Sequence, residues 1–183
     1  AADIHARFHC VGEVTCHALG RGQGVTVKPS VYIETTVPSY LTARPTRDLV
    51  MSARQQLTRE WWDQRRAKFD CYISQLVLDE CSAGDAEAAE RRLGEIATLP
   101  LLTSADSVIA LASELVGRGL VPSAAAADAT HIAIATLHGM HYLLTWNFSH
   151  IANAEKAAAI RLACEQAGFI CPVICTPEEL MEE

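Results

Sequence analysis

The sequence predicts an α/β protein with a central, mostly parallel sheet of about five short strands flanked by helices. Short apolar runs rich in β-branched residues alternate with longer segments of helical periodicity. Those runs are continuously apolar, as is typical of strands buried on both faces by helices. The chain has 183 residues, half of them hydrophobic, which is enough for one core. We expect a single domain over residues 29–183, preceded by a poorly ordered extension over residues 1–28. If translation of the native protein starts at Val27, most of this extension is not native.

The first half of the expected domain holds strands and helices in alternation. Strands are predicted at residues 31–33, 71–73 and 99–102. Helices are predicted at 47–68, from the N-cap Ser74 to 84, and at 85–97. In the first of these helices an apolar face is expected from the spacing of Val50, Ala53, Leu57 and Trp61.

The second half continues the alternation. Strands are predicted at 142–145 and 173–175. Helices are predicted from the cap Ser104 to Gly117, through the Ala-rich stretch 124–139, and at 153–167. Thr176 and Glu179 have capping-box spacing and predict a terminal helix.

Composition excludes several classes of protein. The net charge of −7 argues against a general polyanion binder, so any nucleic-acid contact must be local or bridged by metal ions. The 44–68 segment is such a local region, with seven basic residues against three acidic ones. No window is long and apolar enough to span a membrane, and the N-terminus lacks the apolar core of a secretory signal, so a cytoplasmic protein is expected.

The cysteines predict reduced, mostly buried thiols. There are seven, an odd number, and none is paired in a C-x-x-C motif. A separate group of metal-ligating residue types precedes residue 28 without a standard zinc spacing, which leaves a zinc or redox function as a minor alternative. That group consists of His5, His9, Cys10, Cys16 and His17.

Polar residues follow two of the predicted strands. Glu34 and Thr35 come directly after the first, and Thr145 and Asn147 stand at the end of the fourth. Sites in open parallel sheets form beyond the carboxyl ends of the strands, where the loops converge. These residues are therefore expected to lie close together.

Two acidic residues on predicted helices join the candidates. Asp128 interrupts an otherwise small and apolar stretch, so it is either paired or metal-bound, or it is an exposed partner of a helix N-terminus. Glu80, and not its neighbour Asp79, has the helical spacing to face inward. His131, three residues after Asp128, either orients that carboxylate or is a packed core residue. Glu34, Glu80 and Asp128 together would repel one another without a divalent cation such as Mg²⁺ or Mn²⁺.

Four sequence strings in order resemble the motifs of PIN domains, in the branch of VapC-type toxin ribonucleases. They cover Val-Tyr-Ile-Glu-Thr-Thr (31–36), Ser-Gln-Leu-Val-Leu-Asp-Glu (74–80), Asp-Ala-Thr-His-Ile-Ala-Ile-Ala (128–135) and Leu-Leu-Thr-Trp-Asn (143–147). The resemblance spans residues 28–176 and implies a PIN-like three-layer fold. It also implies metal ligation by Glu34, Glu80, Asp128 and Asn147, with Thr35, Thr145 and His131 in support.

The activity that this resemblance implies is Mg²⁺- or Mn²⁺-dependent cleavage of RNA. It further implies a homodimer and inhibition by a small antitoxin protein. The chain carries Glu34 where the family usually has Asp, and Asn147 where it often has Asp. These two departures motivate an alternative, a catalytically impaired PIN-like module that binds RNA or protein without cutting.

Overall fold

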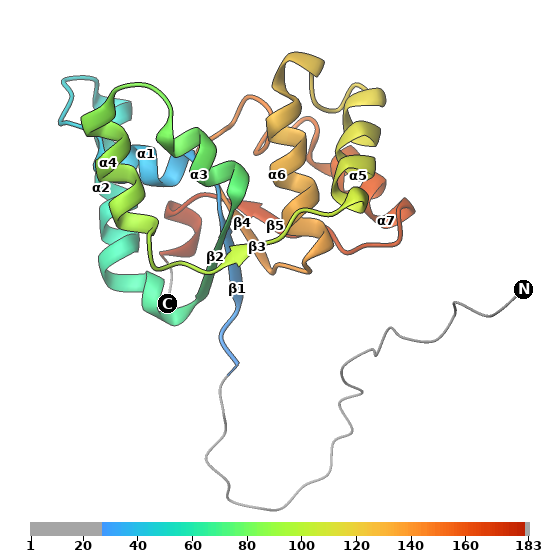
Figure 1. The fold of residues 1–183 in the computed structure, drawn as a ribbon, viewed down its shortest axis with the longest axis horizontal. Coiled ribbons are helices and arrows are strands. Elements are labelled where there is room, and N and C mark those ends of the chain that lie inside the picture. The colour runs from blue at the N-terminus through green and yellow to red at the C-terminus, as the bar shows by residue number, and fades with distance from the viewer. Residues whose placement is uncertain (1–26, 182–183) are drawn as a thin grey trace, which may run out of the picture.

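A computed structural model describes residues 27–181 and contains one five-stranded sheet in which every pairing is parallel (Figure 1). The strand order is β3-β2-β1-β4-β5. The strands are β1 (Ser30–Ile33), β2 (Asp70–Ser74), β3 (Leu101–Leu102), β4 (Tyr142–Leu144) and β5 (Val173–Cys175). The predicted α/β class and the predicted strands are therefore confirmed.

Seven α-helices cover the sheet in the described part of the chain. They are α1 (Thr36–Thr42), α2 (Leu49–Glu60), α3 (Gln75–Ser82), α4 (Ala86–Ile96), α5 (Asp106–Gly117), α6 (Ala126–Leu137) and α7 (Ala157–Gln166). A π-helical turn (Trp61–Arg65) and a 3-10 turn (Arg66–Lys68) extend α2, and further 3-10 turns lie at Ser123–Ala125 and Glu178–Leu180. In Figure 1, α1 to α4 lie on one side of the sheet and α5 to α7 on the other, which gives three layers consistent with a PIN-like fold.

The order in which the strands are added creates a switch point in the sheet. The chain builds outward from β1 to β2 and β3, then returns to place β4 on the other side of β1. Loops leave β1 and β4 in opposite directions at their carboxyl ends, and this opens a crevice there. The site residues described below follow these two strands.

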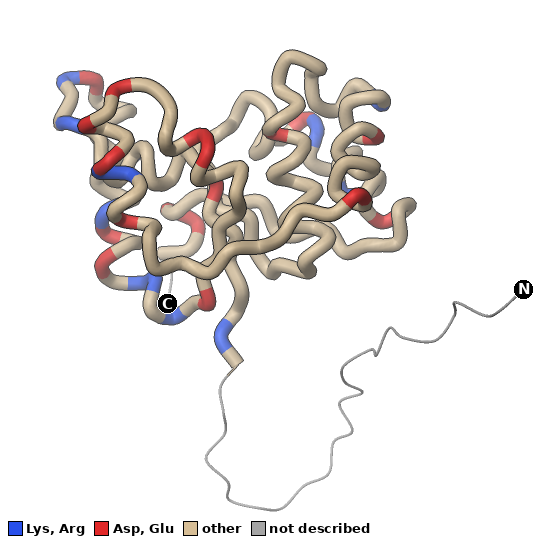
Figure 2. The backbone as a smooth tube through the Cα atoms, in the orientation of Figure 1, with Lys and Arg blue, Asp and Glu red and all other residues tan. Residues whose placement is uncertain are grey.

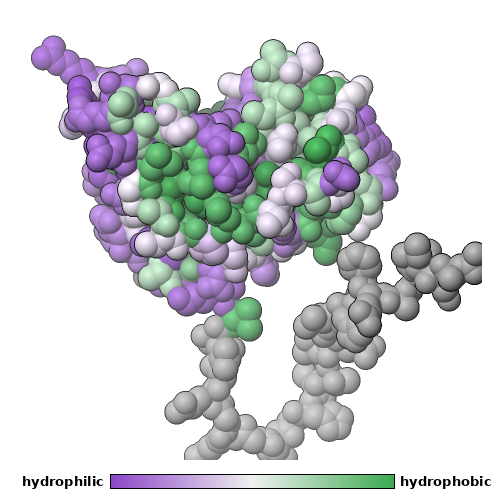
Figure 3. Space-filling model, in the orientation of Figure 1, coloured by the Kyte–Doolittle hydropathy of each residue, from purple (hydrophilic) through white to green (hydrophobic). Residues whose placement is uncertain are grey.

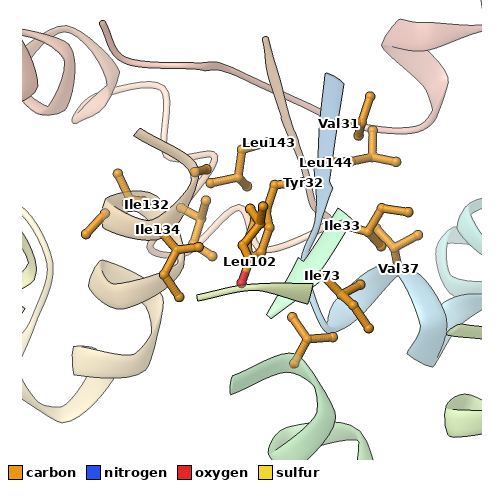
Figure 4. Packing of buried hydrophobic residues seen from close by; sticks show 14 of the residues in the cluster. Val31, Tyr32, Ile33, Val37, Ile73, Leu102, Ile132, Ile134, Leu143 and Leu144 are labelled. Atoms are coloured by element: carbon orange, nitrogen blue, oxygen red, sulfur yellow. The ribbon is translucent and has the colours of Figure 1, made fainter. Parts of the chain in front are cut away.

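The core is formed by the strands, which are buried on both faces. Tyr32 pairs in register with Leu143, and Ile33 with Leu144. Figure 4 shows Tyr32 and Leu143 on the side of Ile132 from α6, whereas Ile33 and Leu144 lie on the side of Val37. All four strand residues are fully buried. The continuous apolar runs in the sequence thus reflect helices packed on both faces of the sheet.

Helix α2 differs from the prediction in its buried face. The expected apolar positions Val50 and Ala53 are exposed, while Gln55 and Thr58 are buried. Burial of these two polar side chains is possible because both are hydrogen-bonded: Gln55 donates to the Arg44 carbonyl at 3.2 Å, and Thr58 donates to the Arg54 carbonyl at 2.6 Å. The other two expected positions turn inward, since Leu57 is half-buried and Trp61, in the π-helical turn that follows α2, is fully buried. The predicted apolar face is therefore wrong for the first half of the helix and correct towards its end.

Helix α1 is absent from the helices predicted from the sequence, and it contains a proline in its first turn. In the structure Pro38 is buried in the first turn of α1. The first backbone N–H groups of a helix have no partner within the helix, so proline costs little there. Pro38 therefore starts a helix immediately after the first candidate site residues.

Three expected caps have different outcomes. Ser104 does not cap α5, whose N-cap is Ala105, and Ser74 occupies the N-cap of α3 without making a side-chain capping bond. The Thr176 box is present, with the Thr176 N–H donating to Glu179 Oε2 at 2.8 Å and the Glu179 N–H donating to Thr176 Oγ1 at 3.3 Å. This box begins only a 3-10 turn within the described residues.

The cysteines that the structure describes are free thiols, as the sequence predicts. The five cysteines of this part are free, four of them buried and Cys171 half-buried. Cys10 and Cys16 lie outside the described residues, as do His5, His9 and His17. Within residues 27–181, each helix is too short or too polar to cross a membrane.

Two glycines allow a matched test of the backbone. Gly168 follows α7 with φ +86°, a left-handed conformation, whereas Gly94 lies in α4 with open space where the Cβ of an alanine would lie. We expect Gly168→Ala to lower the free energy of unfolding by about 1 kcal/mol and Gly94→Ala to raise it by about 0.5–1 kcal/mol. Urea denaturation measures both, and equal effects of the two variants would contradict this description.

Candidate metal centre

The candidate site lies at the carboxyl ends of β1 and β4, beside the start of α6. The carboxyl end of β1 points towards the top of the view in Figure 1, and Figure 3 shows that the upper outline of the molecule is hollowed between the α1–α4 side and the α5–α6 side. Glu34 directly follows β1 and Thr145 directly follows β4. The Glu34 N–H donates to the Leu144 carbonyl at 3.1 Å, which continues the strand pairing into the site.

Glu34 is a buried carboxylate held by three hydrogen bonds to one oxygen. Its side chain is 3% exposed. Oε2 accepts from the Thr36 N–H at 3.1 Å, from the Thr36 hydroxyl, and from the Thr145 hydroxyl at 2.7 Å. The other oxygen, Oε1, takes part in none of these bonds. The geometry therefore fixes the carboxylate from one side and leaves Oε1 for another partner.

The carboxylate of Glu80 is also held by hydrogen bonds to one of its oxygens. It lies in α3, half-buried, and its Oε2 accepts hydrogen bonds from the Thr35 hydroxyl and from His131 Nε2 at 2.9 Å. Its neighbour Asp79 is exposed and accepts from Gln75 at 2.8 Å. Helical spacing predicted that Glu80, and not Asp79, faces inward, and the structure confirms this.

His131 connects Glu80 to a chain of buried hydroxyl groups. Its Nδ1 lies 2.8 Å from the Tyr32 hydroxyl, which lies 2.7 Å from the Ser74 hydroxyl. Tyr32 and His131 are fully buried and Ser74 is 2% exposed. Burial raises the pKa of the Tyr32 hydroxyl far above its usual range, so it stays protonated. The two hydroxyl groups of Tyr32 and Ser74 are therefore neutral and can each donate or accept.

The two carboxylates have pKa values displaced in opposite directions. Burial raises the pKa of Glu34, and the electrostatic effect of His131, with the hydrogen bonds from Thr36 and Thr145, opposes this only in part. Burial also acts to raise the pKa of Glu80, but hydrogen bonds from His131 and Thr35 outweigh it and leave that pKa lowered. A pair of neighbouring acids with separated pKa values is a frequent feature of functional sites.

Glu34, Glu80 and His131 form a group that could hold a metal ion. One ligand atom from each lies within 4.8 Å of the others. Two carboxylates offer oxygen ligands suited to Mg²⁺ or Mn²⁺, and the imidazole offers a nitrogen ligand. A cation would also supply the positive charge that a buried Glu34 carboxylate lacks. The donor set therefore fits a divalent cation.

The other two expected ligands, Asp128 and Asn147, lie on α6 and in the turn after β4. Asp128 is half-buried in the first turn of α6, one turn before His131, and among the described residues it is not a member of the group of three. Asn147 is half-buried, and its Oδ1 accepts from the His150 N–H at 3.1 Å. This bond closes the turn after β4 and gives Asn147 a structural role there.

Three site residues were not singled out from the sequence: Thr36, Tyr32 and Ser74. Thr36 bonds Glu34 and also accepts from the Trp146 N–H at 2.8 Å, so it links the ends of β1 and β4. A signal for Tyr32 was available, because a tyrosine in the middle of a buried strand requires a partner for its hydroxyl. The partners themselves come from α6 and β2, and only the packing identifies them.

Comparison with models of known protein families gives no match for this chain, and no curated protein matches it either.

Proposed function

We propose that this protein is a metal-dependent endoribonuclease of the PIN, VapC-like type, which hydrolyses RNA phosphodiester bonds with Mg²⁺ or Mn²⁺. The proposal rests on one observation above all, the convergence of Glu34, Glu80 and His131 at the switch point of a parallel sheet. The four ordered motifs of the sequence support it, because three of them contribute these residues.

Each residue has a stated part in this proposal. When bound, a divalent cation supplies Lewis-acid chemistry for attack of water on a phosphodiester. Glu34 and Glu80 hold the cation, while Thr36, Thr145 and Thr35 fix their carboxylates by the hydrogen bonds described above. Asp128 and Asn147 are proposed as further oxygen ligands that engage with the cation and the substrate.

The basic segment after β1 supplies a surface for RNA. Most of the blue positions in Figure 2 lie on the α1–α4 side of the molecule. Arg54 of α2 lies 4.8 Å from the Phe148 ring centre and 5.6 Å from the Trp146 ring centre, and Trp146 is bonded to Thr36 of the site. Phe148 is 43% exposed and can stack on a base. Trp61 and Trp62, which follow α2 in the same basic segment, are buried in the core and present no ring to a base.

The partners and location follow from the same resemblance. We propose a homodimer, an inhibitory antitoxin protein and a cytoplasmic location. Sedimentation equilibrium of the purified chain tests the dimer, and co-purification with the product of a neighbouring small gene tests the antitoxin.

The second candidate is a catalytically impaired module that binds RNA without cutting it. The observation that favours it is the engagement of Asn147 Oδ1 in a local turn, which leaves the amide less available as a ligand. Restoring an acid at this position separates the two candidates. If the protein is impaired at this residue, wild type does not cleave RNA and Asn147→Asp does. If it is an active nuclease, wild type already cleaves RNA without the substitution.

The deciding experiment is titration of Mn²⁺ into metal-free wild type and Asp128→Asn, followed by incubation of each with a mixed RNA pool. We expect wild type to bind and cleave, and the variant to lose at least about tenfold in cleavage rate. Asp106→Asn, a substitution in the first turn of α5, is the matched control and should behave as wild type. Unchanged cleavage in Asp128→Asn would remove Asp128 from the site, and absence of Mn²⁺ binding in wild type would end the proposal.

A further inference from the structure

The fully buried His131 provides the site with a nitrogen atom, and this bears on which cation is bound. Magnesium strongly prefers oxygen ligands, whereas imidazole is a good ligand for manganese and later transition metals. Mg²⁺ and Mn²⁺ are otherwise bound by similar carboxylate sites. A directly coordinating histidine would therefore distinguish the two ions.

The separation of His131 Nε2 from Glu80 Oε2 is 2.9 Å. In the structure this is a hydrogen bond, with the Nε2 proton donated to the carboxylate. Two ligands at right angles on one octahedral ion, with bonds of about 2.1 Å, are about 3.0 Å apart. One ion could therefore contact both atoms, which belong to a group of ligand atoms within 4.8 Å of one another. Such an ion would lie off the line that joins the two atoms, so a rotation of the side chains would accompany its binding.

Coordination through Nε2 requires that this nitrogen carry no proton, so that the N–H of the imidazole is at Nδ1. The residue opposite Nδ1 is Tyr32, whose hydroxyl lies 2.8 Å away and can accept that proton's hydrogen bond. Tyr32 can then donate to the Ser74 hydroxyl at 2.7 Å. Either hydroxyl of this last pair can be the donor, so the donor and acceptor roles along the His131, Tyr32 and Ser74 hydrogen bonds can reverse while the side chains stay in place. Ser74 is free for this because it makes no capping bond to α3.

We infer that His131 is a nitrogen ligand, oriented by Tyr32 and Ser74, and that it makes the site selective for Mn²⁺ over Mg²⁺. Tyr32 acts as the outer partner that a metal-bound histidine usually has. Its burial in the middle of β1 fixes the ring of His131 through the sheet itself. This inference rests on the proposed metal site and adds the identity of the metal and of one ligand.

Pulsed electron paramagnetic resonance of the Mn²⁺-loaded protein tests the inference directly. A coordinated imidazole gives a ¹⁴N hyperfine coupling to Mn²⁺, and carboxylate ligands do not. We expect this coupling in wild type and its loss in His131→Asn. We also expect the ratio of Mn²⁺ to Mg²⁺ affinity, measured by calorimetry, to fall about tenfold or more in His131→Asn.

Tyr32→Phe provides a second variant that leaves the imidazole in place. It should retain the ¹⁴N coupling while weakening Mn²⁺ binding about 10- to 100-fold, because Nδ1–H loses its acceptor. Tyr72→Phe is the matched control, since Tyr72 pairs in register with Tyr32 on the adjacent strand β2, and it should bind Mn²⁺ as wild type does.

The two kinds of failure can be told apart. Mn²⁺ binding that depends on Glu34 and Glu80 but shows no ¹⁴N coupling would overturn the inference and leave the metal site standing, with His131 only a hydrogen-bond donor to Glu80. No Mn²⁺ binding in wild type would overturn both the inference and the proposed function.

Discussion

Glu34→Gln is expected to abolish Mn²⁺ binding and RNA cleavage while raising the stability of the metal-free protein. Burial raises the pKa of Glu34, so the folded protein holds this proton more tightly than the unfolded chain does. The free energy of unfolding therefore falls as pH rises from the ordinary carboxyl value of 4.5 towards the raised pKa, and stays low above it. A neutral glutamine removes that penalty and can still accept the bonds from Thr36 and Thr145.

The expected gain for metal-free Glu34→Gln at neutral pH is about 1 kcal/mol, or about 2–4 °C in Tm. Differential scanning calorimetry at several pH values in the presence of a chelator measures it. Wild type should approach the variant in stability as pH falls, since protonation of Glu34 removes the same charge. Cleavage by the variant at the wild-type rate would contradict the ligand assignment, and a lower Tm would contradict the direction of the pKa displacement.

Glu80→Gln is the matched variant, with the same loss of function and the opposite effect on stability. Its pKa is lowered, since hydrogen bonds from His131 and Thr35 outweigh burial, so the charged form contributes stability above the ordinary value of 4.5. That contribution is lost as pH falls through the lowered pKa. Metal-free Glu80→Gln should therefore be less stable than wild type at neutral pH, by a small amount because the side chain is 32% exposed. Equal stability changes in the two variants would refute the separation of the two pKa values.

Leu143→Ala is expected to cause the largest loss of stability, about 3–5 kcal/mol. Leu143 is fully buried on β4, next to the central strand, and pairs with Tyr32 on one side and Ile174 on the other. Truncation removes apolar contacts and leaves a cavity between the sheet and α6, where the surrounding backbone is fixed on both sides. Urea denaturation followed by circular dichroism measures the change.

Leu162→Ala makes the same substitution on α7, where the side chain is 52% exposed. Its free energy of unfolding should lie within about 0.5 kcal/mol of wild type. If Leu162→Ala lowered the free energy of unfolding as much as Leu143→Ala does, the difference in burial between the two side chains would not explain their contributions to stability. Mn²⁺ affinity of Leu143→Ala, measured where the variant is still folded, should stay within a fewfold of wild type because Leu143 is not one of the proposed ligands.

The sequence alone determined the alternation of strands and helices in this protein. The 31–33 and 142–144 runs are apolar without interruption, a pattern typical of strands covered on both faces, and this pattern predicts a parallel sheet. Polar residues directly after these strands, above all Glu34 and Thr145, were identifiable because carboxyl ends of parallel strands converge. Helical spacing also indicated that Glu80, and not its neighbour Asp79, faces inward.

Tertiary structure alone decided which faces are buried and which groups meet. Val50 and Ala53 have helical spacing, yet they are exposed, whereas Gln55 and Thr58 of the same helix are buried. Gln55 donates to the Arg44 carbonyl outside the helix, and the Thr58 hydroxyl accepts from Trp146 Nε1, which is 88 residues away. His131 had two interpretations from the sequence, as the orienter of Asp128 or as a packed residue. In the structure it contacts Glu80 and Tyr32, which are 51 and 99 residues away. Contacts at such separations depend on strand order and helix docking, and these arise from burial of the whole core and leave no local pattern in the chain.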